Sequence, residues 1–284
     1  MPKQRQFGVS THLFHNQRLG REHLLEVAAH GFEAVELFAT RTHFDYHNSA
    51  AVADLQQWLA EAGLELHGIH APVSEGYFGG RPTGVLNIAS ADPAQRQRAM
   101  TETELALYVA RRIPTKMFVA HLGVPRSHPP APGENSRAAA RRSIEELQRA
   151  ALPLGVQVAL EVLPNDLSHP RSLVHFVEED VDEPGVGICL DCGHAHMTNE
   201  GLVDAIETVS GHLVTTHVHD NRGRLDEHLV PFEGTIDWSA AITAMKKVGY
   251  DGPMMLEVAQ HGPPRETLRS ARKARARLEA LLSD

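Results

Sequence analysis

The segment HVHDNRGRLDEHLVPFEGTIDW, which begins at His217, holds the densest group of residues in this sequence that could perform chemistry. His217 and His219 share one face of an apolar run, because side chains alternate along a β-strand. Asp226 and His228 lie two residues apart in the polar loop that follows, and Asp237 can cap the helix expected after it. A strand that ends in histidine, followed by an Asp-x-His loop, places metal-binding side chains at one end of a sheet.

Residues of the same kind end six consecutive apolar runs, from the third expected strand to the eighth. Alternation puts each of them on one face with a smaller or apolar residue two positions earlier, so that we expect them all to point inward. One further histidine follows the sixth strand, and the Asp-x-His loop adds two candidates. The nine candidate metal ligands, five histidines and four carboxylates, are His70, His121, Glu161, Asp191, His194, His217, Asp226, His228 and Glu257.

Four ionised carboxylates in one cavity repel one another, which raises their pKa values unless cations neutralise them. Divalent metal ions are the simplest source of that positive charge. Nitrogen and oxygen ligands in this ratio favour Zn²⁺, with Mn²⁺ or Fe²⁺ as alternatives. Because a single catalytic zinc takes about three protein ligands and a water, nine ligands are enough for two or three ions.

Eight strand–helix units must position these residues, and their regular alternation predicts a (β/α)₈ TIM barrel. A doubly wound sheet is the alternative. The pattern shows no linker, so we expect residues 1–284 to form a single domain with its active site at the C-terminal face of the barrel. Strands are expected at Phe7–Phe14, Phe32–Phe38, Leu64–His70, Lys116–His121, Val156–Leu163, Val186–Asp191, His212–Asp220 and Met254–Val258. Helices are expected at Arg21–His30, Ser49–Ala62, Asp92–Arg112, Ser136–Leu152, Pro170–Glu178, Glu200–Val209, Trp238–Val248 and Pro264–Leu282.

Two long loops, Ala71–Ala91 and Leu122–Asn135, both follow strands and are therefore expected at the C-terminal face, where they could cover a substrate. The formal net charge of −9 disfavours a protein that binds nucleic acid through a wide basic surface. Cys189 and Cys192 are read as packing residues in a reducing compartment. The N-terminal residues lack the apolar run of a signal peptide, and no run has membrane-spanning length, so a cytoplasmic protein without membrane contact is expected.

The motifs HGIHAP, VAHLG, ALEVLPN, CLDCGHAH, MLEV and the segment from His217 resemble the xylose isomerase-like barrel superfamily, which also contains apurinic endonuclease IV. The resemblance covers the third to eighth strands; the first two units agree only generically. In the endonuclease branch nine residues hold three zinc ions, and the resemblance carries that set onto the nine candidates above. In the sugar isomerase and epimerase branch a set of four is typical, and it falls on Glu161, Asp191, His217 and Glu257.

The favoured function is a metal-dependent isomerase or epimerase of a small-molecule sugar or sugar phosphate. Here Glu161 and Glu257 would move protons, while His194, Arg222 and Phe14 would contact the substrate. The alternatives are a solvated loop arginine for Arg222 and a core or rim packing residue for Phe14. The alternative is a zinc-cluster phosphodiesterase of the endonuclease IV kind, acting on abasic DNA or a small phosphate ester. A non-catalytic metal-binding barrel is a third class. The sequence pattern does not specify an oligomeric state.

Overall fold

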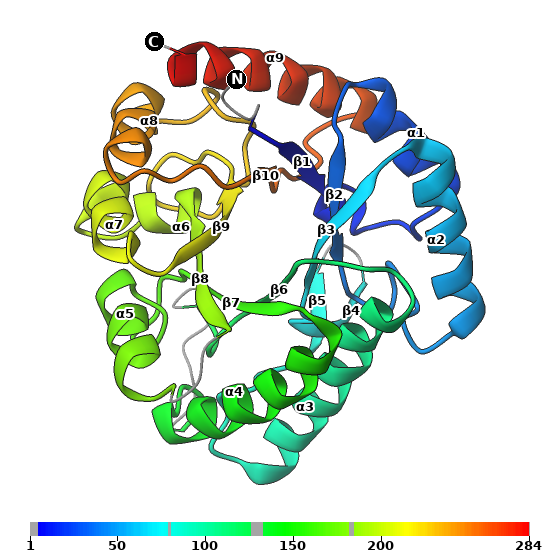
Figure 1. Ribbon diagram of the computed structural model, residues 1–284, viewed down its shortest axis with the longest axis vertical. Helices are drawn as coiled ribbons and strands as arrows, with labels where there is room; N and C mark the ends of the chain where they lie inside the picture. Colours follow the sequence, from blue (N-terminus) through cyan, green and yellow to red (C-terminus); the bar gives the residue numbers. More distant parts are fainter. Residues whose placement is uncertain (1–4, 79–80, 126–132, 182–184, 284) are drawn as a thin grey trace.

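The computed structural model describes residues 5–78, 81–125, 133–181 and 185–283. Among them, eight parallel strands close into a barrel in the order β1-β10-β9-β8-β7-β6-β3-β2, with helices around the outside (Figure 1). The (β/α)₈ prediction is therefore confirmed, and the doubly wound sheet is excluded. The barrel strands are β1 (Phe7–Ser10), β2 (Ala34–Phe38), β3 (Glu65–His70), β6 (Met117–Ala120), β7 (Gln157–Glu161), β8 (Val186–Asp191), β9 (Leu213–Val218) and β10 (Met254–Leu256).

The outer helices begin and end where the sequence provides capping residues. Asn48, Asp92, Ser136 and Asp237 each accept a hydrogen bond from a backbone N–H in the first turn of the helix that follows. Gly63 ends one helix in the left-handed conformation, at φ 66°. The helices are α1 (Arg21–Ala29), α2 (Ser49–Ala62), α3 (Pro93–Leu107), α4 (Arg137–Ala151), α5 (Pro170–Glu179), α7 (Gly201–Val209), α8 (Trp238–Lys247) and α9 (Pro264–Ser283).

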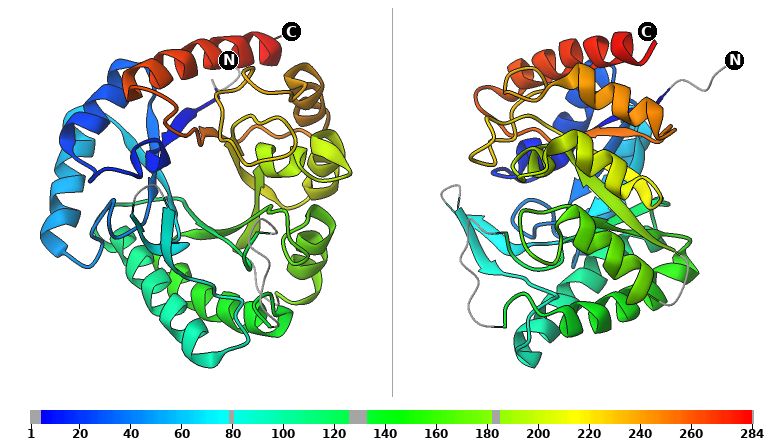
Figure 2. Two further views of the ribbon diagram at one scale, coloured as in Figure 1. Left: turned by 180° about the vertical axis from the view of Figure 1, so that it is seen from behind. Right: turned by 90° about the vertical axis from the view of Figure 1, so that its left-hand side faces the viewer.

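Two segments differ from the expectation. The first strand ends at Ser10, because the Ser10 hydroxyl accepts a hydrogen bond from the His12 N–H and starts a 3₁₀ turn over Thr11–Phe14. The expected loop Ala71–Ala91 contains an antiparallel hairpin of β4 (Ser74–Phe78) and β5 (Arg81–Val85). Figure 2 shows this hairpin projecting beyond one end of the barrel.

A short helix, α6 (Cys192–His196), was also not expected; it begins because the Asp191 side chain accepts a hydrogen bond from the His194 N–H. In the second long loop, residues 126–132 lie outside the described residues. Cys189 and Cys192 are buried and free, as expected for packing residues. None of the described helices combines the length and the apolar character that a membrane crossing requires.

The core sits both inside the barrel and between the barrel and its helices, where the strands bury residues on both faces. The register shifts in two strand pairs. His67 is the extra residue of β3 in its pairing with β2, and Val214 is the extra residue of β9 in its pairing with β8. Such bulges bend a strand and re-aim its side chains. The His67 imidazole lies inside the barrel, with Nε2 3.4 Å from the Thr215 hydroxyl. The interior below the mouth is thus partly polar.

Candidate active site

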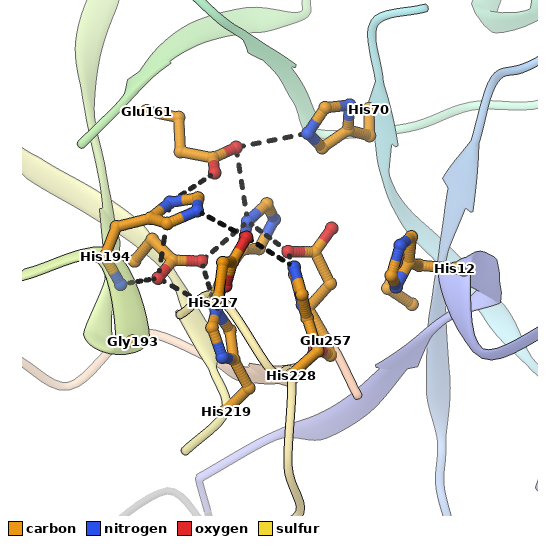
Figure 3. Close-up of polar contacts among 12 residues, drawn as sticks. His12, His70, Glu161, Gly193, His194, His217, His219, His228 and Glu257 are labelled. Carbon is orange, nitrogen blue, oxygen red and sulfur yellow. Dashed lines mark hydrogen bonds and ion pairs between the residues drawn. The ribbon is translucent and has the colours of Figure 1, made fainter. Parts of the chain in front are cut away.

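Four of the predicted ligands meet at the C-terminal mouth of the barrel. Glu161 and Asp191 end β7 and β8, His217 lies near the end of β9, and Glu257 follows β10. One ligand atom from each lies within 4.8 Å of the others. His217 Nδ1 is 3.3 Å from Glu161 Oε2, 3.4 Å from Glu257 Oε2 and 3.8 Å from Asp191 Oδ2. Figure 3 shows Glu161 and Glu257 approaching the His217 ring from different strands.

A second group joins the first through Glu161. His70 Nε2 is 3.1 Å and His121 Nε2 is 3.2 Å from Glu161 Oε2. His70 ends β3 and His121 directly follows β6, two neighbouring strands of the barrel. A single carboxylate oxygen, Glu161 Oε2, therefore faces three imidazoles, counting that of His217.

A third group lies on the side of the loop that follows β9. His194 Nε2 and His228 Nε2 are 3.1 and 3.0 Å from Asp226 Oδ2. His219, which is fully buried, completes a set of four ligand atoms within 4.8 Å of one another. Its Nε2 is 3.0 Å from the Asp191 carboxylate, so it links this group to the first.

Asp220 holds the loop that carries Asp226 and His228. Its buried carboxylate accepts four hydrogen bonds, two on each oxygen, at 2.9 to 3.1 Å. His228 and Phe232 have positive φ angles of 44° and 75°, a conformation that is strained for side chains other than glycine. The carboxylate contacts offset this strain. The donors are the backbone N–H groups of Asn221, Phe232 and Ile236 and the indole N–H of Trp238.

The histidines present the geometry of metal ligands. Nδ1 of His70, His194 and His228 lies 2.8 to 3.0 Å from the backbone carbonyls of Ala71, Val162 and Glu257. A carbonyl only accepts, so each Nδ1 carries a proton, and each Nε2 is the ring atom directed at the carboxylates, the orientation that metal-ligating histidines have. His121 Nε2 and His217 Nδ1 are buried with no hydrogen-bond partner among the described residues. The nine predicted residues, with His219, thus form groups that could hold metal ions.

Charges of opposite sign compensate one another across the site. Burial would raise the pKa of Glu161, but His121 and His217 hold it well below its usual range. Burial would likewise raise the pKa of the Asp226 carboxyl, yet His228 and His194 keep it well below normal. Burial would lower the pKa of His194, whereas Asp191 and Asp226 raise it well above its ordinary value. The lowered pKa values favour the ionised forms of Glu161 and Asp226.

The site opens into two adjoining cavities. The smaller, of about 130 Å³, lies over the ligands and is bounded by His12, Phe38, Val73, Tyr77 and Leu163 besides the ligands themselves. The larger, of about 620 Å³, shares His194, Asp226 and Pro125 with it and extends toward the loop after α6. Cavities of roughly 300–1,000 Å³ are typical of small-molecule sites, so the mouth has room for a substrate of this class.

A family model described as xylose isomerase-like TIM barrel matches residues 24–281. The chain belongs to this family. D-psicose 3-epimerase of Enterocloster bolteae is 25% identical over 246 residues, which span 84% of this chain and 76% of that protein. The crystal structure of a D-tagatose 3-epimerase-like protein superimposes with a TM-score of 0.78 at 25% identity, covering 98% of this chain and 97% of that one. The IOLI protein with a bound zinc atom has the same fold, with a TM-score of 0.76 at 18% identity and coverage of 97% and 98%.

Within this xylose isomerase-like barrel, two residues expected to contact substrate lie elsewhere. Phe14 is only 1% exposed and packs in the core, with its ring 4.6 Å from that of His23, so it does not line either cavity. The 3₁₀ turn after β1 is what directs it inward. Arg222 is exposed and pairs with Glu227 in the same loop, and it lines neither cavity. His194, in contrast, borders both cavities.

Three residues of the site were not among the sequence candidates. His219 shares a strand face with His217, so the period-two rule that selected His217 could also have selected it. Glu36 is a carboxylate in the apolar run AVELF of β2, which is itself a signal of a buried polar role. His12 lies in the turn after β1, and its ring is 4.7 Å from that of His228. That contact depends on the closure of the barrel, and no sequence pattern indicates it.

Proposed function

We propose that residues 1–284 form a single-domain, metal-dependent isomerase or epimerase that acts on a small sugar or sugar phosphate. The observation that carries the proposal is the group Glu161, Asp191, His217 and Glu257, whose ligand atoms lie within 4.8 Å of one another. Two of these residues are glutamates on strands that are separated by two others around the barrel, so they reach the mouth from different sides. The similarity to a D-psicose 3-epimerase over 84% of the chain supports the same class of reaction.

The four residues would hold a divalent ion, Zn²⁺ by the ligand types, with Mn²⁺ or Fe²⁺ as alternatives. A bound ion would polarise the carbonyl and the neighbouring hydroxyl of a sugar, which would acidify the C–H of the hydroxyl-bearing carbon next to the carbonyl. Glu161 or Glu257 then removes that proton on one face of the sugar, and the other glutamate returns a proton on the opposite face. Their carboxylates are 1% and 4% exposed, which keeps bulk water from the transferred proton.

His194 is the residue best placed to orient the substrate. It borders both cavities, and its ring is fixed by the Val162 carbonyl at 3.0 Å. His12, Phe38 and Tyr77 form part of the wall of the smaller cavity, above the carboxylates. A hydrophobic wall facing a row of ligands is what a sugar needs, because its C–H face and its hydroxyls require different surroundings.

The test uses metal-loaded protein and a panel of ketoses and their phosphates in D₂O. Deuterium should enter the carbon next to the carbonyl of the true substrate. Glu161→Gln and Glu257→Gln should each lower turnover by about 10²–10⁴-fold, whereas a control, Asn48→Ala in the cap of α2, should leave it unchanged. If a metal-loaded chain incorporates no deuterium into any member of the panel, the isomerase proposal is wrong.

A second candidate is a metal-cluster hydrolase of phosphate esters, for which abasic DNA is one substrate. The group of His194, His219, Asp226 and His228 favours it, because a four-ligand epimerase site does not require these residues. Clustered ions clamp the attacking and leaving oxygens of a phosphate ester. The double variant His70→Ala with His121→Ala separates the two. An epimerase should keep much of its activity, while a cluster hydrolase should lose nearly all of it.

A further inference from the structure

Glu36, on β2, is a buried carboxylate that belongs to none of the ligand groups. It is 1% exposed, and its Oε2 lies 3.1 Å from Nε2 of His217. Its other oxygen, Oε1, is buried and has no hydrogen-bond partner among the described residues. An ionised side chain in this position costs free energy unless a specific contact compensates it. His217 is its hydrogen-bond partner.

The neighbouring strand leaves room for this carboxylate. Gly68 of β3 pairs with Glu36 in the barrel register, and a Cβ atom at Gly68 would come 3.3 Å from Glu36 Oε2. Contacts this short are tighter than most real Cβ contacts, so a larger residue at position 68 would press on the carboxylate. The register shift at His67 sets this pairing. Glu36 is therefore held against His217 by the barrel itself.

His217 has acidic groups on both of its ring nitrogens. Nε2 faces Glu36, and Nδ1 faces Glu161, Asp191 and Glu257 at 3.3 to 3.8 Å. A carboxylate only accepts, so the hydrogen bond to Glu36 requires the proton on Nε2. In the neutral imidazole this leaves the Nδ1 lone pair directed at the other three residues, where a ligand atom is needed.

We propose that Glu36 is a positioning residue that fixes the tautomer and ring orientation of His217 for metal binding. This inference rests on the proposed function, because it assumes an ion at the group of Glu161, Asp191, His217 and Glu257. The physical basis is the carboxylate–histidine–metal arrangement, in which the second carboxylate orients the ring and raises its basicity as a ligand. The role differs from that of His70, His194 and His228, whose Nδ1 atoms are fixed by backbone carbonyls.

The experiment titrates the full-length, metal-stripped chain with Zn²⁺ against a chromophoric chelator. Glu36→Leu removes the hydrogen-bond acceptor while keeping a side chain of similar volume. It should lower the affinity for one Zn²⁺ ion per chain by about 10–100-fold. Glu36→Gln keeps an amide oxygen that can accept from Nε2, so its loss should be smaller. Thr216→Val is the matched control: Thr216 is also buried on β9, but its hydroxyl donates to the Pro253 carbonyl at 3.0 Å. It should leave Zn²⁺ affinity within about twofold of the unaltered chain.

Three results would overturn the inference. The first is that Glu36→Leu and Glu36→Gln both fold and bind Zn²⁺ within twofold of the unaltered chain. The second is that Thr216→Val weakens Zn²⁺ binding as much as Glu36→Leu does, which would mean that loss of any buried hydrogen bond has this effect. If the unaltered chain binds no divalent ion, the proposed function fails, and the inference fails with it. If Glu36→Leu does not fold, a folded Glu36→Gln chain that binds Zn²⁺ within twofold of the unaltered chain overturns the inference by itself.

Discussion

Replacing Asp220 by asparagine should loosen the loop that carries Asp226 and His228. Each carboxylate oxygen of Asp220 accepts two hydrogen bonds from N–H donors. An asparagine side chain has one oxygen and one NH₂ group, so in either orientation two of the four donors face another donor. The loop also contains the two strained residues His228 and Phe232, whose backbone relaxes once these contacts are lost.

The magnitude follows from the number of donors left without an acceptor. A buried, unsatisfied donor costs about 1–3 kcal/mol, so two of them cost about 4 kcal/mol. Since about 1.4 kcal/mol is a factor of ten, local opening of the loop should become roughly 10³-fold more frequent. Trp238→Phe removes one donor and leaves the carboxylate with three, at about 1.5 kcal/mol and about a tenfold increase in opening.

The assay is native-state amide hydrogen exchange of the segment from Asp220 to Trp238, read by mass spectrometry. Exchange reports the free energy of local opening. The amides of Phe232 and Ile236 donate directly to the Asp220 carboxylate and should respond most. Exchange in Asp220→Asn within threefold of the unaltered chain would refute the reasoning. So would a Trp238→Phe variant that exchanges as fast as Asp220→Asn, because one lost donor would then equal two.

Two other substitutions test the packing of the site. Gly193→Ala should displace His219, because a Cβ atom at Gly193 would lie 2.0 Å from His219 Cε1. We expect the free energy of unfolding to fall by about 1–3 kcal/mol. A thermal melt checks this against the control Gly211→Ala, where nothing lies within 4 Å of the added Cβ. Equal melting temperatures for the two variants would contradict the geometry. Phe14→Leu should lower stability by about 1–2 kcal/mol and leave KM unchanged, because Phe14 is buried away from both cavities. A several-fold rise in KM in steady-state kinetics would show that Phe14 contributes to substrate binding after all.

The long strands and helices could be predicted from the sequence because apolar runs and helix-capping residues are local features of the chain. Shorter features escaped that analysis. The 3₁₀ turn after Ser10 depends on a single side-chain hydrogen bond, and the hairpin within residues 71–91 lacks a strong alternation of apolar and polar residues. Arg222 pairs with Glu227 in the same loop, and its contact with substrate stays a prediction.

The sequence by itself determined which end of the barrel carries the chemistry, because parallel strands that each end in histidine or a carboxylate must present those residues at the same mouth. That these residues bind metal stays a prediction. Tertiary structure decided how they pair across the barrel: three imidazoles around one oxygen of Glu161, and Glu36 behind His217. Period two specifies the face of a strand on which a side chain lies. The curvature, register shifts and closure of the barrel set the distance between residues far apart in the chain, and these depend on all the strands together.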